Sequence, residues 1–472
     1  MSEIHIFTGQ LQIVPALVGG FLFIAGLCSM VVKERLYLSE TLLATVFGII
    51  VGPRALNWMD PTSWSSNPLQ LTQEFSRYAL AIEVMIAGIC LPQKYIFKEW
   101  KSLGVLLLPI LTTMWLVTSA IIKFVFQVPF LHALAVGACA APTDPVLANA
   151  ILKGMFAETH VPLRLRNILI AESGANDGLG FPFLYFAIYL IRFNTGHAMG
   201  AWMYATWAYQ ILMSVCIGTA VGYVARIALQ YSERWRWVDR ESFLSSSVTL
   251  TLLLVGICTI LGTDDILCCF VAGNSISWND WFRIEIEDMG LQETLNAMMS
   301  VAFFIYFGAV IPWSEYTAAN MLHPWRIVVL VVLVMVLRRL PAMVALYKFI
   351  PAVRTWYDVL FAGWFGPIGV SAVFYAVETV KQLDEHDVSA GRVQQTVFPI
   401  VSALVFGSVL VHGVSIPLVL MGKRVGTTMA RTQSNELSFR IWSRRPRADS
   451  DNEYDKQTAE DSPNLEIAHT QT

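Results

Sequence analysis

Charge is scarce in this chain: Lys, Arg, Asp and Glu make up only 14% of its 472 residues, while hydrophobic residues make up 55%. A soluble domain carries about 25% charged residues, so this composition excludes an ordinary soluble protein. Alternation of apolar and polar residues at a period of two is missing as well, which argues against a transmembrane barrel. We therefore expect an all-α polytopic membrane protein, because helices satisfy their own backbone groups in lipid.

Cysteine patterns typical of metal or redox sites are also missing. The seven cysteines lie in apolar stretches, and no C-x-x-C motif is present. Cysteines in such stretches are usually small buried core residues. We expect no cofactor and no enzymatic activity, and the net charge of −3 gives no sign of a nucleic-acid partner. The chemistry must then lie with the few charged residues inside the apolar runs.

Long apolar runs are what the chain has in abundance. A membrane span needs about 20 apolar residues, and we predict about 13 spans with boundaries uncertain by a few residues. The second and ninth are short. No linker longer than a loop interrupts residues 1–422, which we interpret as one transmembrane domain. The predicted spans are residues 11–32, 39–53, 76–92, 103–126, 130–153, 166–192, 203–231, 243–261, 264–278, 293–312, 323–349, 355–380 and 394–421.

Residues 423–472 differ sharply from the rest of the chain. They begin with seven basic residues between Lys423 and Arg447, continue into an acidic run around Asp449–Asp455, and contain few apolar residues. Such a composition predicts a mostly disordered tail. Basic residues directly after the last span place it in the cytosol by the positive-inside rule, where they can also contact anionic lipid.

Two spans are interrupted by proline and glycine. One interruption runs from Ala141 to Pro145 and contains Pro142, and the other contains Gly366, Pro367 and Gly369. Proline removes a backbone donor and breaks a helix, and the opposed half-helix ends then present partial charges to one point. One interruption in each half of the chain predicts an inverted-repeat transporter with two crossed discontinuous helices. A packing kink is the alternative for either break alone.

A buried acid lies in the span at 166–192. Charges at bilayer depth cost about 2.5–3.5 kcal/mol on insertion scales and mark ion or proton pathways. Asp177 has Asn176 beside it and Ser173 one turn before it, so a carboxylate, an amide and a hydroxyl can converge. This set can hold a small cation or a proton, and hardly both at once.

Two further acids lie near the breaks. Asp144 follows Pro142 and can face Asp177 across a small cavity, or it can cap the helix that begins at Pro145. Glu172 needs a proton or a cation, which Arg338 or Arg339 can supply, although both arginines can instead snorkel to the membrane face.

Polar residues also interrupt two later segments. Asp264 and Asp265 stand at the head of an apolar run, where they either line an ion entrance or simply start a helix. His412 is isolated, and we expect a structural role for it.

Four motifs in order resemble the monovalent cation/proton antiporter superfamily, and specifically the eukaryotic-type sodium/proton exchangers, over roughly residues 10–422. The nearer likeness is to the fungal plasma-membrane Na⁺/H⁺ antiporters of the fission-yeast sodium-resistance type, through G-T-D-D-I-L, N-D-G and R-R-L-P. The motifs are T-D-P-V (Thr143–Val146), E-S-G-A-N-D-G (Glu172–Gly178), F-G-P-I-G-V-S-A-V (Phe365–Val373) and V-H-G-V-S-I (Val411–Ile416).

The resemblance implies a plasma-membrane homodimer whose protomers have a core domain and a dimerisation domain. It implies that Asp177 binds the exchanged Na⁺, Li⁺ or H⁺, with Thr143 and Asp144 at the site on the crossed helix. Asn176 stands where electrogenic bacterial relatives have a second aspartate, which implies electroneutral exchange. Glu172 would pair with an arginine of R-R-L-P, and Arg338 fits this slightly better than Arg339.

Exporting cytosolic Na⁺ against inward protons would give salt tolerance and pH homeostasis. A K⁺/H⁺ exchanger of the same fold is the alternative, and a carrier of another solute is a weaker one. An intramembrane aspartyl protease is a further alternative, but its acids normally lie in a G-x-G-D context, which this sequence lacks. Two broken, crossed helices also fit a carrier that works by alternating access better than they fit a cation channel.

Overall fold

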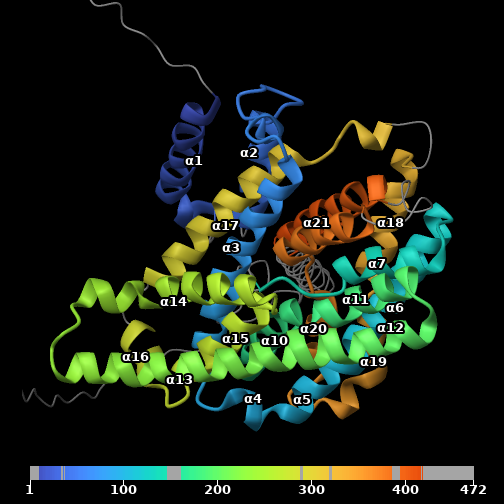
Figure 1. Cartoon of the computed structure of the whole chain (residues 1–472). Coiled ribbons are helices and arrows are strands. Elements are labelled where there is room, and N and C mark those ends of the chain that lie inside the picture. The colour runs from blue at the N-terminus through green and yellow to red at the C-terminus, as the bar shows by residue number, and fades with distance from the viewer. Residues whose placement is uncertain are drawn as a thin grey trace, which may run out of the picture. The chain divides into compact units, whose positions relative to one another are not determined.

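The computed structural model describes residues 10–32, 36, 38–145, 161–287, 291–317, 322–384, 394–415 and 417. These residues belong to one compact unit, Met1–Leu418, and their regular elements are helices, without a strand among them (Figure 1). The predicted all-α architecture is thereby confirmed. The predicted tail at 423–472 lies outside the described residues.

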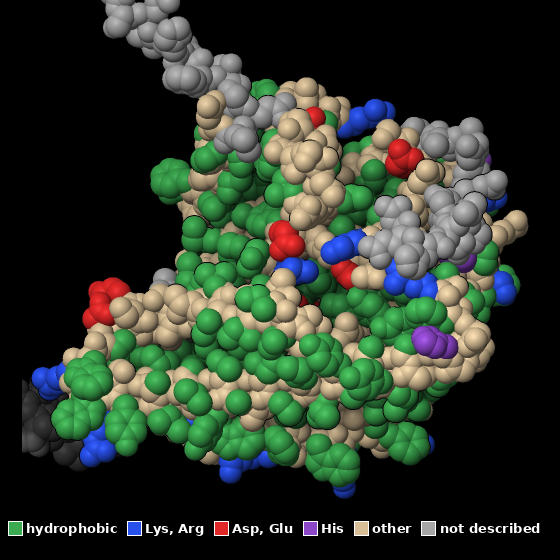
Figure 2. Space-filling view, viewed as in Figure 1, with side chains coloured by type: hydrophobic (Ala, Val, Ile, Leu, Met, Phe, Trp, Pro, Cys, Tyr) green, Lys and Arg blue, Asp and Glu red, His purple; other side chains and the backbone are tan. Residues whose placement is uncertain are grey.

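Within the described residues, five helical segments are long and apolar enough to cross a membrane. They are Trp100–Phe126, Thr195–Arg234, Arg240–Leu261, Pro324–Phe349 and Gln394–Ser415. Shorter apolar helices accompany them, among them the two that the sequence marks as short. Figure 2 shows hydrophobic side chains spread over the outward face of α13 (Met213–Arg234), where Tyr223, Val224 and Tyr231 are exposed. An exposed apolar helix face of this kind suits contact with lipid.

For description we divide the helices into two groups, which also pack against each other. We call the first the scaffold group; it comprises α1 (Gln10–Leu27), α2 (Glu40–Val51), α3 (Pro68–Cys90), α13, α14 (Arg240–Leu261), α15 (Asp265–Ile276) and α17 (Leu291–Val310). We call the second the core group; it comprises α6 (Leu111–Phe126), α7 (Phe130–Cys139), α10 (Leu163–Gly178), α11 (Gly180–Arg192), α18 (Pro324–Leu337), α19 (Leu340–Leu346), α20 (Trp356–Trp364) and α21 (Val370–Asp384).

Shorter elements complete or join these groups. The helix of α6 begins earlier as α5 (Trp100–Val105) and a π-helical turn at Leu106–Ile110, and α18–α19 ends in a turn at Tyr347–Phe349. A helix made of α12 (Thr195–Ala201) and the π-helical stretch Trp202–Leu212 contacts α11 and continues into α13, so it joins the groups. The remaining elements are α4 (Tyr95–Lys98), α16 (Trp281–Glu287) and short turns at Pro61–Ser63 and Glu315–Thr317.

The short helix α15 is almost entirely buried between α3 and α13. Gly88 of α3 and Gly273 of α15 lie against each other, and a Cβ on either would press into the backbone of the partner helix. Small residues allow such close approach. Because α15 is enclosed by protein rather than by lipid, its 12 residues need not match the bilayer thickness.

Several span boundaries differ from the prediction. The helix predicted to begin at residue 76 begins at Pro68, with the Asn67 side chain accepting a hydrogen bond from the Gln70 amide. Its first turns are polar, and side chains elsewhere in the protein partner them, so hydropathy alone missed them. The span at 166–192 consists of α10 and α11, separated at Leu179. The predicted span 203–231 belongs to a longer helical segment, Thr195–Arg234.

The two predicted interruptions are real. Helix α7 ends at Cys139, before a non-helical stretch at 141–144, and α20 ends at Trp364, before a non-helical stretch at 365–369. Helix α21 begins directly after the second stretch. The two breaks contact each other, because Asp144 of the first bonds to Pro367 of the second and to Val370 directly after it.

Candidate functional site

The two breaks are joined through Asp144. Its backbone N–H donates to the Pro367 carbonyl at 2.9 Å, and its carboxylate Oδ2 accepts from the Val370 amide at 2.7 Å. An acid at a helix N-terminus satisfies orphan amides and complements the positive end of the helix dipole. Asp144 therefore caps α21. The segment beginning at Pro145, which the capping alternative named, lies outside the described residues beyond Pro145 itself.

Arg338 supplies the opposite charge at the opposite helix ends. Its guanidinium donates to the Ala140 carbonyl, after α7, and to the Gly366 carbonyl, after α20. Cations stabilise the negative C-terminal ends of helices. The three described half-helix ends at the crossing, those of α7, α20 and α21, thus each face a side chain of complementary charge.

Glu172 pairs with Arg339, and the preference for Arg338 is wrong. Arg339 Nη1 and Nη2 reach Glu172 Oε1 and Oε2 at 2.6 and 2.7 Å, a bidentate pair, while its Nε donates to the Ala362 carbonyl. The backbone at this point explains why the two arginines bind different partners. α18 ends at Leu337 and α19 begins at Leu340, so the two arginines lie at a helix junction and reach different partners. Neither arginine snorkels, because both are buried.

Three of the predicted site residues bind one another. Asn176 accepts from the Thr143 amide at 3.1 Å and donates to the Thr143 hydroxyl at 2.9 Å, which lies 3.0 Å from the Ser173 hydroxyl. This arrangement attaches α10 to the break after α7. It also commits the Asn176 amide to Thr143.

Asp177 is the exception in this polar cluster. Its side chain has no exposed surface, and neither carboxylate oxygen has a hydrogen-bond partner among the described residues. Asp144 and Ser371 are its polar neighbours. The Asp177 backbone is held in place, since its carbonyl accepts from the Tyr375 hydroxyl. A buried carboxylate without a partner is costly unless it takes up a proton or a cation.

Sequence reasoning missed Glu83. This residue lies on α3, is 2% exposed, has an unpartnered Oε1, and has Asp144 and Asp177 as charged neighbours. The signal was present, because Glu83 is an acid inside the run A-L-A-I-E-V-M-I-A-G. It was overlooked because the residue stands alone, without the motif that marks the other acids.

Asp264 and Asp265 begin α15, as the helix-start alternative proposed. Asp264 Oδ1 accepts from the Leu267 amide at 3.0 Å, and Asp265 lies 3.5 Å from Arg77 Nε. Both are buried, so they do not stand at an exposed interface. Tyr375 has these acids and Asp177 among its charged neighbours, which places the pair close to the site.

His412 supports the second break from the helix at 394–415. Its ring nitrogens contact the Ser408 and Trp364 carbonyls at 2.9 and 3.0 Å, and the Ser408 hydroxyl accepts from the Ile368 amide at 2.7 Å. These contacts satisfy backbone groups that the break exposes. A structural role follows from them.

We predict that Gly369→Ala disables the site while leaving the membrane domain folded. A Cβ at Gly369 would overlap the Asp144 carboxylate, so Asp144 would lose its cap on α21. Overpacking of this kind costs about 1–3 kcal/mol. Gly256→Ala, on the outer helix α14 with open space around it, is the matched control. Ion flux and thermal unfolding of both variants test this; unchanged flux in Gly369→Ala would contradict it.

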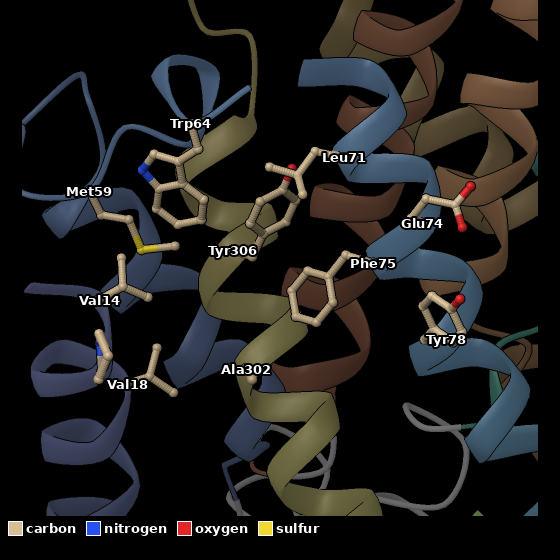
Figure 3. Close-up of a pocket in the computed structure, with 11 residues that line it drawn as sticks. Val14, Val18, Met59, Trp64, Leu71, Glu74, Phe75, Tyr78, Ala302 and Tyr306 are labelled. Atoms are coloured by element: carbon tan, nitrogen blue, oxygen red, sulfur yellow. The ribbon is translucent and has the colours of Figure 1, made fainter. Parts of the chain in front are cut away.

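A cavity of about 570 Å³ lies elsewhere, between α1, α3 and α17. Figure 3 shows Val14, Val18, Met59, Phe75 and Tyr306 around it, and its lining is almost wholly apolar. None of the predicted site residues lines it. The buried acids at the crossing, rather than this cavity, form the candidate site.

Residues 20–422 match the family model described as sodium/hydrogen exchanger, transmembrane. A probable Na⁺/H⁺ antiporter of Schizosaccharomyces pombe is 38% identical over 90% of this chain and 58% of its own length. A Saccharomyces cerevisiae Na⁺/H⁺ antiporter is 36% identical over 88% and 44%, and a second S. pombe Na⁺/H⁺ antiporter is 35% identical over 86% and 89%. The chain thus spans about half the length of some relatives and most of another.

The fold is also similar to that of a solved structure. The sodium proton antiporter MjNhaP1 from Methanocaldococcus jannaschii superposes with a TM-score of 0.65, covering 89% of this chain and 98% of that one. The two sequences are 16% identical, so this likeness concerns the fold alone.

Proposed function

Because the chain belongs to the sodium/hydrogen exchanger family, a family of membrane transporters, we propose that it exchanges one cytosolic Na⁺ or Li⁺ for one proton by alternating access. The single observation that carries this proposal is Asp177, fully buried with both carboxylate oxygens unpartnered. It is the described acid at the crossing best placed to hold either ion. The relatives named as Na⁺/H⁺ antiporters support the choice of ions.

Coupling follows from the cost of an empty site. An unpaired carboxylate inside a membrane protein is expensive, so the core moves only when Asp177 carries a proton or a cation. Two of the fixed charges around it are already compensated: Glu172 by Arg339, and Asp144 by the α21 N-terminus. One carboxylate alternating between two monovalent ions gives one-for-one exchange.

The cation would be bound by oxygen atoms. Asp177 and Asp144 supply carboxylates, Ser173 and Thr143 supply hydroxyls, and Glu83 adds a further carboxyl oxygen from α3. Asn176 orients Thr143 and adds no charge. Electroneutral exchange requires Glu83 to keep one protonation state through the cycle. The same oxygen set can hold K⁺, which keeps K⁺/H⁺ exchange as the alternative.

We propose a plasma-membrane location with the tail in the cytosol. Counting the predicted spans, the loops on the side of the tail carry most of the loop arginines and lysines, as the positive-inside rule requires. The loops on that side hold eleven basic residues: Lys33, Arg35, Lys94, Lys98, Lys101, Arg164, Arg234, Arg236, Arg240, Arg283 and Arg354. The loops on the other side hold three: Arg54, Lys381 and Arg392. The N-terminus then faces outside.

We further propose that residues 1–422 are the exchanger domain and 423–472 a cytosolic tail, and that the protein is a homodimer. The packing into scaffold and core groups supports a fixed part and a moving part. The scaffold helices would then form the dimerisation domain, and the core group would carry the ion.

The test is exchange driven by a pH gradient in proteoliposomes, with Na⁺, Li⁺ and K⁺ added in turn and the membrane potential clamped at several values. We expect Na⁺ and Li⁺ to dissipate the gradient at a rate independent of voltage. A current proportional to flux would show unequal charge movement and overturn one-for-one exchange. Absence of proton flux with all three cations, in folded protein, would overturn the function itself.

A further inference from the structure

Glu378 connects the two groups of helices. It lies on α21, in the core group, and is 7% exposed. Its Oε1 accepts hydrogen bonds within the core group, from the Tyr185 hydroxyl of α11 and the Gln382 amide of α21, both at 2.9 Å. Its Oε2 accepts from Gln73 Nε2 of α3, in the scaffold group, at 2.7 Å. One carboxylate thus holds both groups.

A second contact runs parallel to this one. The Arg77 guanidinium lies over the Phe374 ring, 5.7 Å from its centroid, and its Nε lies 3.5 Å from Asp265. Gln73 and Arg77 are four residues apart on α3, and Phe374 and Glu378 are four residues apart on α21. Residues at this spacing share a helix face, so α3 and α21 meet along one line of polar and aromatic contacts.

This line lies on one side of the ion site. Helix α21 begins at the break, beside Asp144, and Glu378 stands two turns further along it, beyond Tyr375, whose hydroxyl binds the Asp177 carbonyl. In the proposed orientation, α21 runs from the crossing toward the outer face.

We propose that the Gln73–Glu378 hydrogen bond is an outer latch, which holds the core group against the scaffold group and closes the path from Asp177 to the outside. The inference rests on the proposed exchange function and orientation. Opening the outer path separates α21 from α3, and this bond must then break. A single hydrogen bond to a carboxylate suits this role, because its net strength is modest and it re-forms in every cycle. Tyr185 and Gln382 keep Glu378 in position when Gln73 leaves.

The test compares Gln73→Leu with Thr72→Val. The Thr72 hydroxyl bonds the Tyr306 hydroxyl of α17 at 2.8 Å, so Thr72→Val removes a neighbouring buried hydrogen bond that lies within the scaffold group. In the reconstituted protein, we expect Gln73→Leu to speed hydrogen exchange of the α21 segment 374–384 about tenfold to a hundredfold, as loss of one hydrogen bond to a carboxylate predicts. Thr72→Val should leave that segment at the wild-type rate.

Transport assays add a second measurement, the apparent Na⁺ affinity at each membrane face. A purely structural role of Gln73 would not shift these two affinities in opposite directions. An outward shift should raise the apparent Na⁺ affinity at the outer face and lower it at the inner face, and the two changes should multiply to about tenfold to a hundredfold. Gln73→Glu, which sets two carboxylates against each other, should produce the larger shift of the two variants. The latch would be overturned if Gln73→Leu changed the apparent Na⁺ affinity in the same direction and by the same factor at both faces. It would also be overturned if hydrogen exchange of the 374–384 segment were as slow in Gln73→Leu as in Thr72→Val. Because hydrogen exchange needs no transport, failure of the proposed function is distinguishable from failure of the latch.

Discussion

Replacing Asp177 with asparagine is expected to reduce cation-dependent proton flux to the level of empty liposomes. Asparagine has the shape of aspartate but binds no exchangeable proton and carries no charge, so neither ion can be held. The Asp177 oxygens have no hydrogen-bond partner among the described residues, and the amide of asparagine can still meet the neighbouring Ser371 hydroxyl. The variant should therefore unfold at a temperature no lower than that of the wild type. Flux driven by a pH gradient, measured beside thermal unfolding, gives both quantities.

Asp239→Asn is the matched control for this variant. Asp239 caps α14 through the Ser242 amide, and its carboxyl is exposed to solvent. Asparagine caps helices about as well as aspartate, so this variant should exchange at the wild-type rate. Retention of full exchange by Asp177→Asn would remove Asp177 from the mechanism, whatever the control shows.

Replacing Arg339 with methionine is expected to cause a large loss of stability. The change leaves Glu172 buried without its bidentate partner, and breaking a buried ion pair in this way costs about 3–5 kcal/mol. Unfolding of the detergent-solubilised protein, by heat or denaturant, measures the loss. The charge of Glu172 causes it, so Glu172→Gln combined with Arg339→Met should recover a substantial part.

A double-mutant cycle distinguishes the two arginines. Glu172 and Arg339 should show a coupling energy of about 3 kcal/mol, at the upper end for residues in contact. Glu172 and Arg338 should couple by well under half of that, because Arg338 donates to the carbonyls of Ala140 and Gly366 instead. A stronger coupling of Glu172 to Arg338 would contradict the pairing seen in the structure.

Much of the candidate site could be predicted from sequence because membrane burial makes certain residues conspicuous. An acid such as Asp177 or Asp144 inside an apolar run stands out, and so do prolines and glycines that interrupt a span. Glu83 meets the same criterion and was still missed, because hydropathy shows that a residue is buried and not which other residues it faces. Only the packing of α3 against α10 and α21 brings it to Asp144 and Asp177.

The sequence could not predict which arginine pairs with Glu172, for a related reason. Arg338 and Arg339 are adjacent, and their chemical types are the same, so nothing in the motif separates their roles. Their directions depend on backbone angles at the junction of α18 and α19. Likewise, the helix capped by Asp144 is far from it in sequence, and the latch joins residues 73 and 378.

The amino-acid sequence is enough to predict a helical membrane protein with two broken spans and an acid inside the membrane. It could do so because lipid imposes a severe cost on charge and on unpaired backbone groups, and that cost is local to each segment. Which charges neutralise each other, and which carboxylate remains without a partner, became visible only in the packed structure. Those outcomes depend on distances between helices remote in sequence, where differences of a few ångströms separate an ion pair from an ion-binding site.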